Sequence, residues 1–272
     1  LSNPYHIAIV DAIVDALAAH DVFVSICSSS DKAEHERDAV RSLGQRRVDA
    51  LIVIESPTFN TTPDATLDSF TIPGKPTILV NEHLSRATPH HVVRCAQEPG
   101  IRQALARFLD GGRRRIALFR GGPSYSFDLK ETLFKGFVRD NGLDSRACPV
   151  VRVKRANDAQ AVHDSARLVG ELLHGRDAPQ AVLACNDLIA IGAVQGALAA
   201  GARIPDDLAV IGVDNSIVSQ FSSPPLSTVD LRMKTVGQTA ARLFLELRER
   251  GFRGVEPARR TLDARLIVRG SG

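Results

Sequence analysis

The sequence lacks the features that would place it in a membrane or on a secretion route. No apolar run approaches the roughly 20 residues that a membrane-spanning helix requires. The first ten residues carry neither the basic start nor the small-residue cleavage site of a secretion signal. We therefore expect a cytoplasmic globular protein with no membrane partner.

Cysteine is scarce, and the four cysteines, Cys27, Cys95, Cys148 and Cys185, are far apart in the chain. None belongs to a CxxC pair, which argues against a zinc site and against a disulfide framework. Cys27 and Cys185 lie in apolar, strand-like runs, where a thiol acts as a small hydrophobic side chain. The pattern predicts reduced thiols, no metal and no cofactor.

Catalytic motifs are missing as well. The sequence has no GxSxG nucleophile elbow, no P-loop, no HExxH and no GxGxxG after a strand. His90-His91 and His35-Glu36 have no third ligand at a spacing that would complete a metal site, so we interpret them as surface residues. We predict that the chain is not an enzyme and has no catalytic residue.

A large excess of charge of either sign is also absent, since the formal net charge is +3. Short basic runs such as 113–115 are typical of solvated turns and helix ends. No helix-turn-helix, zinc finger or basic helix accompanies them. If the protein contacts DNA, another segment makes that contact.

Strands and helices are predicted to alternate along most of the chain. The apolar runs that read as strands are 23–28, 50–54, 77–80, 91–95, 115–119, 150–153, 181–185, 209–213 and 261–268. The helical patterns cover about 4–17, 31–43, 97–109, 124–139, 159–173, 187–200 and 233–250. Because the connections are short, the order predicts an α/β fold with parallel sheets. A chain of 272 residues, 44% of them hydrophobic, can bury one large core or two modest ones.

The most informative stretch is 181–229. A strand over 181–185 is followed by Asn186-Asp187, whose side chains can cap a helix. That helix ends before Gly201, and the strand over 209–213 follows it. Asp214-Asn215 then lies just beyond the carboxyl end of a strand, where open α/β sheets bind ligands.

Three motifs in this stretch carry a family resemblance: AxNDxxAxG, IPDDLAVIGVD and PPLSTV. In this order and spacing they resemble the effector-binding core of the LacI/GalR family of bacterial transcription regulators. The resemblance extends from Leu1 to the terminal RLIVRGSG. It implies a two-lobed, type I periplasmic-binding-protein-like fold, in which each lobe is a parallel sheet flanked by helices.

The resemblance also implies three chain crossings between the lobes, near Gln97, Arg232 and Glu256. The first lobe is then 1–97 with 232–256, and the second is 98–231 with 257–272. In the family, a strand and a DNA-binding headpiece precede the first helix of this chain, and we expect neither within the sequence given.

The function that this resemblance implies is regulatory. A sugar or another metabolite binds between the lobes and changes how a helix-turn-helix headpiece binds operator DNA. The family also implies a homodimer, with the helix around Ile13-Ala16-Leu17 and the region 220–226 as contact surfaces. The alternative is a periplasmic solute-binding protein of a transporter, which shares the two-lobed architecture. The PPLSTV motif and the absence of a secretion signal argue against that alternative.

Candidate effector contacts follow from the rule that ligands bind beyond the carboxyl ends of strands. The rule selects Glu55-Ser56, Asn81-Glu82, the segment 121–127 with Phe127, Asn186 and Asp214. In the family, the position of Asp214 contacts the effector. The position of Asn186 lines the pocket, although this side chain could instead only cap the helix.

Tyr5 and Asn81 carry weaker expectations from the resemblance. Tyr5 matches an aromatic residue at the mouth of the cleft, and the alternative is a buried packing residue. Asn81 lies where the family often has an acidic contact, so its neutral amide indicates a changed ligand or no direct contact.

Two departures from the family pattern concern specificity. Leu133 lies three residues before Gly136, where the family commonly has an arginine that binds the effector. With Phe127, it makes this wall apolar, and Lys130 is the nearby cation that could substitute. Ala96-Gln97 replaces the usual Asp-Asn pair.

Overall fold

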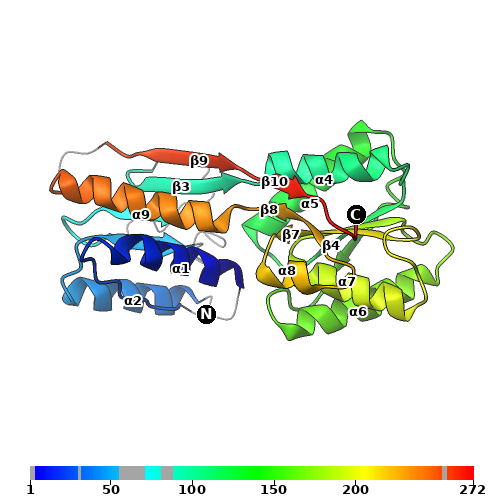
Figure 1. Ribbon diagram of the computed structural model, residues 1–272, viewed down its shortest axis with the longest axis horizontal. Coiled ribbons are helices and arrows are strands. Elements are labelled where there is room, and N and C mark those ends of the chain that lie inside the picture. Colours follow the sequence, from blue (N-terminus) through cyan, green and yellow to red (C-terminus); the bar gives the residue numbers. More distant parts are fainter. Residues whose placement is uncertain (1–3, 30–31, 55–70, 81–87, 253–255) are drawn as a thin grey trace. The chain divides into compact units, whose positions relative to one another are not determined.

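The computed structural model describes residues 4–29, 32–54, 71–80, 88–252 and 256–272, and these form two compact units (Figure 1). The first unit comprises Asn3–Cys95 and Met233–Leu262, and the second comprises Ala96–Arg232 and Asp263–Gly272. The first two crossings fall close to the positions expected from the sequence. The third falls after Leu262 rather than near Glu256, because the strand that follows Glu256 belongs to the sheet of the first unit.

The first unit is a four-stranded sheet with helices. Its elements are α1 (Pro4–Ala18), α2 (Ala33–Gln45), β1 (Leu51–Ile54), β2 (Thr77–Val80), β3 (His91–Ala96), α9 (Met233–Glu249) and β9 (Arg259–Asp263). The strand order is β1-β2-β3-β9, and β2 is parallel to both β1 and β3. β3 and β9, far apart in sequence, lie side by side (Figure 1).

Helices cover both faces of this sheet. Leu43 of α2 packs with Leu51, Val53, Leu79 and Val92 on one face. On the other, α9 contacts β2 and packs against α1. Because both faces are covered, every residue of β2 is buried, which explains why its sequence is a continuous apolar run rather than an alternating one.

Four expectations for the first unit are wrong. His90, His91 and Glu36, which we interpreted as surface residues, are buried, with exposed fractions of 6%, 5% and 6%. The segment 23–28 forms no strand, and Phe23 is 94% exposed. A strand needs a neighbour for its backbone hydrogen bonds, and no described strand pairs with this segment. For the same reason Cys27 is exposed rather than buried. Finally, Ile13 and Leu17 are buried in their own unit, so these side chains are not the predicted dimer surface.

The second unit is larger. Its elements are α4 (Glu98–Asp110), β4 (Ile116–Arg120), α5 (Tyr125–Asp140), β5 (Val150–Arg152), α6 (Ala159–Leu173), β6 (Ala181–Ala184), α7 (Asp187–Ala199), β7 (Ala209–Asp214), α8 (Ile217–Phe221), β8 (Ser227–Asp230) and β10 (Arg265–Ile267). The strand order is β10-β8-β7-β6-β4-β5, and all neighbours are parallel except β10 and β8.

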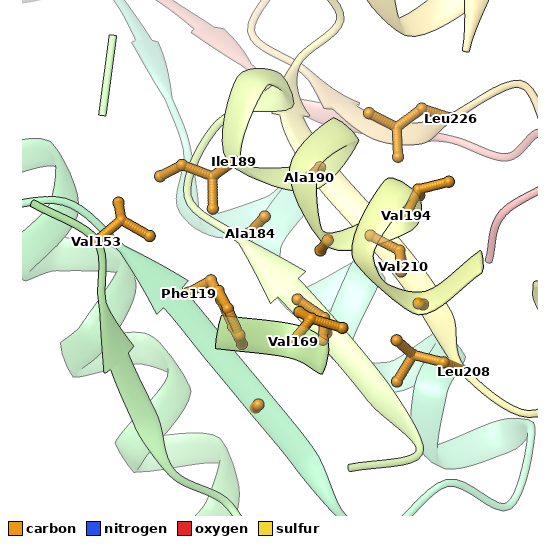
Figure 2. Packing of buried hydrophobic residues seen from close by; sticks show 14 of the residues in the cluster. Phe119, Val153, Val169, Ala184, Ile189, Ala190, Val194, Leu208, Val210 and Leu226 are labelled. Carbon is orange, nitrogen blue, oxygen red and sulfur yellow. The ribbon is translucent and has the colours of Figure 1, made fainter. Parts of the chain in front are cut away.

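Alternate residues of the central strands face opposite layers of helices. Phe119, Ala184 and Val210 point toward α6 and α7 and form one core with Val169 and Val194, seen in Figure 2. The intervening strand residues face the layer that contains α4 and α5, both of which contact the sheet. The sheet is therefore buried on both faces, as the apolar runs predicted.

The C-terminal strand expected over 261–268 is also wrong as a single element. It is interrupted at Ala264, whose backbone N–H donates to the carbonyl of Ala96 at 2.9 Å. β9 before this point and β10 after it belong to different sheets. The crossover expected over 214–229 contains α8 and β8. The remaining predicted helices and strands are present, with bounds shifted by at most two residues.

Candidate functional site

The carboxyl ends of β4, β6 and β7 lie at one edge of the sheet in the second unit. These strands are neighbours and parallel, so the residues that follow them share that edge. The segment after β4 leads into α5, Asn186 follows β6, and Asp214 ends β7. We call this the ligand edge.

Asp214 and the residue after it have an unusual backbone. The φ angle is +113° at Asp214 and +52° at Asn215, and both residues are half-buried. Asparagine tolerates the left-handed region, whereas +113° is unfavourable for any residue with a Cβ. Such strain persists only where surrounding contacts impose it, and it concentrates at functional sites.

Contacts of Asn215 and Ser216 hold this strained turn. Asn215 donates its backbone N–H to Thr228 Oγ1 at 3.2 Å and accepts from Arg269 Nη2 at 2.7 Å through its side-chain oxygen. Ser216 donates its backbone N–H and its hydroxyl to Asp187 Oδ2, each at 2.7 Å. The chain beyond Asp214 is therefore fixed by groups from α7, β8 and the C-terminal tail.

Asp187 is the centre of this support. The sequence indicated only that it could cap the helix together with Asn186, whereas its carboxylate instead accepts hydrogen bonds from Ser216 and Thr228. Its side chain is 1% exposed, and Oδ1 accepts from Thr228 Oγ1 at 2.6 Å. Burial raises the pKa of this carboxyl from 3.8 to about 6, although its hydrogen bonds from Thr228 and Ser216 and the charge of Arg269 act in the opposite direction. The donors come from residues 29 and 41 positions later, so no local pattern could have identified this role.

Asn186 is a helix cap. Its Oδ1 accepts from the backbone N–H of Ile189 at 2.9 Å, and its Nδ2 donates to Ala156 O at 2.7 Å and to Asn157 Oδ1 at 3.1 Å. Both amide hydrogens are thus engaged within the protein. The Asn186 side chain could bind a ligand only through the second lone pair of Oδ1. Its predicted contact with the effector therefore stays a prediction.

The corner between β4 and α5 contains a buried arginine that sequence reasoning also missed. Arg120 is 1% exposed and pairs with Glu131 and, at 2.7 Å, with Asp128. It also donates to the carbonyls of Gly121 at 3.1 Å and Gly122 at 3.0 Å. Burial acts to lower the pKa of Arg120, but the hydrogen bonds and charges of the two carboxylates raise it overall.

Lys130 lies on α5 at the same corner and is also 1% exposed. Its Nζ donates to Ser126 Oγ at 2.7 Å and to Ser126 O at 3.4 Å, and it lies 5.5 Å from the centre of the Phe127 ring. The latter distance is that of a cation–π contact. Phe127 and Leu133 are half-buried on this helix.

Electrostatics relate this corner to Asp214. Burial raises the pKa of the Cys185 thiol to about 12, while the charges of Lys130 and Arg120 act to lower it and those of Glu131 and Asp214 to raise it. One buried thiol after β6 therefore lies within electrostatic range of both Lys130 and Asp214. At such a pKa the thiol is protonated and unreactive.

The other predicted contacts belong to the first unit or lie outside the described residues. Tyr5 on α1 is 4% exposed, and its ring makes an edge-to-face contact with that of His6, with ring centres 5.5 Å apart. This burial fits the alternative that Tyr5 is a buried packing residue. Ser56 and Asn81, with Glu55 and Glu82, lie outside the described residues.

Two further searches cover only the part of the chain that the structure describes. No group of three or more His, Cys, Asp and Glu side chains there could hold a metal ion. No described helix combines the length and the hydropathy needed to cross a membrane.

Comparison with known proteins identifies the family. Residues 105–272 match the periplasmic binding protein-like domain. The chain is 25% identical over 271 residues to the ribose operon repressor of Halalkalibacterium halodurans, covering 99% of this chain and 76% of the relative. It is 28% identical over 283 residues to the HTH-type transcriptional regulator CelR of Thermobifida fusca, covering 100% of this chain and 77% of the relative.

Solved structures share the fold. A LacI family transcriptional regulator from Enterococcus faecium with bound ribose superposes with a TM-score of 0.82 at 24% identity, covering 100% of this chain and 95% of that one. An uncharacterized protein from Actinobacillus succinogenes gives a TM-score of 0.86 at 21% identity, covering 100% and 96%. Since the domain match spans more than half of the chain and the relatives that align along its length are transcription regulators, the chain belongs to the periplasmic binding protein-like family and is the effector-binding domain of a LacI-type transcription regulator.

Proposed function

We propose that this domain senses a small polar metabolite, a sugar or a related compound, with Asp214 at the ligand edge as the principal contact. The observation that carries the proposal is the strained backbone at Asp214, held by contacts of the following residues. A carboxylate in this position can accept hydrogen bonds from two vicinal hydroxyl groups. The names of the relatives and of the solved structures, which include ribose, cellobiose and lactose, fit such a ligand.

Other residues complete the proposed contact set. Asn186 follows β6, and α5, the helix after β4, carries Phe127, Lys130 and Leu133; we expect these four residues near the ligand. From the family resemblance we add Tyr5, Ser56 and Asn81 of the first unit.

The proposed regulatory mechanism is linkage. An effector can change operator affinity only if it binds two arrangements of the protein with different affinity. We expect a homodimer, because a two-fold protein matches a pseudo-palindromic operator read by two helix-turn-helix headpieces. The relatives are named as repressors and regulators of transcription, so we expect this protein to act in the cytoplasm, where bacterial DNA is.

The test is binding of candidate sugars and polyols by calorimetry or by dye-based thermal shift, since the chain has no tryptophan to report binding. A ligand at 100 times its Kd stabilises the protein by about 2.7 kcal/mol, which raises Tm by several degrees. Asp214→Ala should weaken binding at least tenfold, because a hydrogen bond to a charged group contributes about 1.5–3 kcal/mol.

A second variant separates binding from folding. Asp214→Gly removes the Cβ that makes a φ of +113° unfavourable, so it should stabilise the free protein by about 1 kcal/mol while losing the ligand. Asp206→Ala, which removes an exposed carboxylate of the same unit, is the control. Unchanged affinity in both Asp214 variants would remove this residue from the site.

A further inference from the structure

The two buried cations at the corner of β4 and α5 differ in their partners. Arg120 is neutralised by two carboxylates, those of Asp128 and Glu131. Lys130, equally buried, takes part in no ion pair between described residues. Its hydrogen bonds go to the hydroxyl and the carbonyl of Ser126, which are neutral oxygens.

A buried ammonium group without a counter-ion is unfavourable for folding. Removing a charge from water is compensated only by an opposite charge and by well-placed hydrogen bonds. Lys130 has two hydrogen bonds and the face of one aromatic ring. A long apolar side chain could fill the same volume without this penalty, so the charge has no evident structural use.

The surroundings of Lys130 bring together the departures from the family pattern. Gln97, which stands in place of an expected Asp-Asn pair, donates from Nε2 to Ser126 Oγ at 3.1 Å. Ser126 in turn accepts from Lys130. Leu133, which replaces an expected arginine, lies one turn later on α5. The two positions that depart from the family pattern, Gln97 and Leu133, thus lie near Lys130: Gln97 through their shared partner Ser126, and Leu133 one turn along the same helix.

Lys130 also lies on the side of the sheet where the ligand is proposed to bind. It is carried by the first half of α5, which begins just beyond the carboxyl end of β4. It acts on the Cys185 thiol after β6, as Asp214 does. Lys130 and Asp214 thus both follow or end strands whose carboxyl ends lie at the same edge of one sheet.

We propose that Lys130 receives a carboxylate of the effector, so that the sensed metabolite is an acid such as a sugar acid rather than a neutral sugar. This inference rests on the proposed function. A single ammonium group matches a single negative charge, since the charge of Arg120 is already neutralised. Asp214 would hold the hydroxyl groups of the ligand.

The experiment is a set of calorimetric titrations with matched acid and neutral compounds at constant ionic strength. The pairs are glucuronate with glucose, galacturonate with galactose, gluconate with glucitol, ribonate with ribose, and benzoate with benzyl alcohol. We expect at least one acid to bind tenfold or more tightly than its neutral partner. Lys130→Met should lower the affinity for that acid at least tenfold and change the affinity for its neutral partner less than twofold.

Two variants act as controls for charge and shape. Lys135→Met removes the same charge from the same helix, but Lys135 is 65% exposed and paired with Glu131, so acid binding should be unchanged. Lys130→Arg keeps the charge and should retain part of the affinity. Equal loss in Lys135→Met would show a general effect of net charge and overturn the assignment.

The thermal stability of the free protein tests the inference even when the ligand has not been identified. If the charge of Lys130 is kept for a ligand, Lys130→Met should leave Tm of the free protein unchanged or raise it by a few degrees. A fall in Tm of several degrees would show that Lys130 is structural and would overturn the inference.

The outcomes also separate this inference from the proposed function. Neutral compounds that bind as well as their acids, with no effect of Lys130→Met, would overturn the acidic effector and leave the sensing function standing. Failure of every compound to bind would count against both.

Discussion

The two units show how differently apolar sequence can be used within one chain. In the second unit, every predicted strand finds a neighbour in a six-stranded sheet. In the first unit, the apolar segment 23–28 pairs with no described strand, and Phe23 and Ile26 are 94% and 51% exposed. The strands of the second unit and this segment of the first unit both contain β-forming residues. Their β-propensity is therefore similar, and the difference is whether a neighbouring strand is available for backbone hydrogen bonds.

The largest expected effect contrasts two phenylalanines. Phe119→Ala removes a fully buried ring from the core of the second unit and should lower the free energy of unfolding by about 3–5 kcal/mol. Phe23→Ala in the first unit should change it by less than about 0.5 kcal/mol, because the ring is exposed. Chemical denaturation of the two variants measures both values. A similar loss of stability in both variants would mean that the segment 23–28 is packed in solution.

A smaller effect is expected where helices pack through glycine in both units. A Cβ at Gly192 of α7 would collide with the carbonyl oxygen of Val162 on α6, and a Cβ at Gly237 of α9 would lie 2.6 Å from that of Ile9 on α1. Each change to alanine should destabilise by about 1–3 kcal/mol, Gly192 more than Gly237.

Gly170 is the matched control for these two variants. It also lies within a helix, and a Cβ there would meet no atom within 4 Å. Gly170→Ala should stabilise by about 0.5–1 kcal/mol, because alanine loses less backbone entropy on folding. Thermal denaturation of the three variants gives the order, and a destabilising Gly170→Ala would contradict the packing argument.

A further prediction concerns the pH dependence of the stability of the second unit, through the buried carboxyl group of Asp187. Because the folded-state pKa of Asp187 is about 6 and the ordinary value is 3.8, the folded protein binds this proton more tightly. Its contribution to stability is fully present below about pH 4 and is lost as the pH rises through about 6. Asp187→Asn should flatten the pH dependence of the unfolding free energy in that interval. An unchanged profile would show that other groups determine it.

Much of the fold could be predicted because the local signals were strong. In the second unit, Asn186 was expected to cap a helix, and its side chain does bond the third residue of α7. The strand 209–213 was expected to present Asp214 at its end, and β7 ends there. The failures, at 23–28 and at Ala264, are places where the identity of the neighbouring strand decides the outcome.

The candidate site was less accessible to sequence reasoning. Lys130 was identified as a nearby cation, but neither its burial nor its neutral partner Ser126 could be anticipated. Arg120 and Asp187 were missed, since their partners lie on other elements. A residue's charge is visible in a sequence, but its desolvation is not.

The sequence by itself determined the order of strands and helices, the motifs of the regulator family and the position of Asp214 at a strand end. These depend on periodicity, caps and local spacing, which neighbouring residues impose. Tertiary structure alone decided which apolar segments became strands, the φ of +113° at Asp214, and the contrast between Arg120, which pairs with two carboxylates, and Lys130, which pairs with none among the described residues. Pairing, strain and burial depend on residues that are distant in the chain and meet only when it folds.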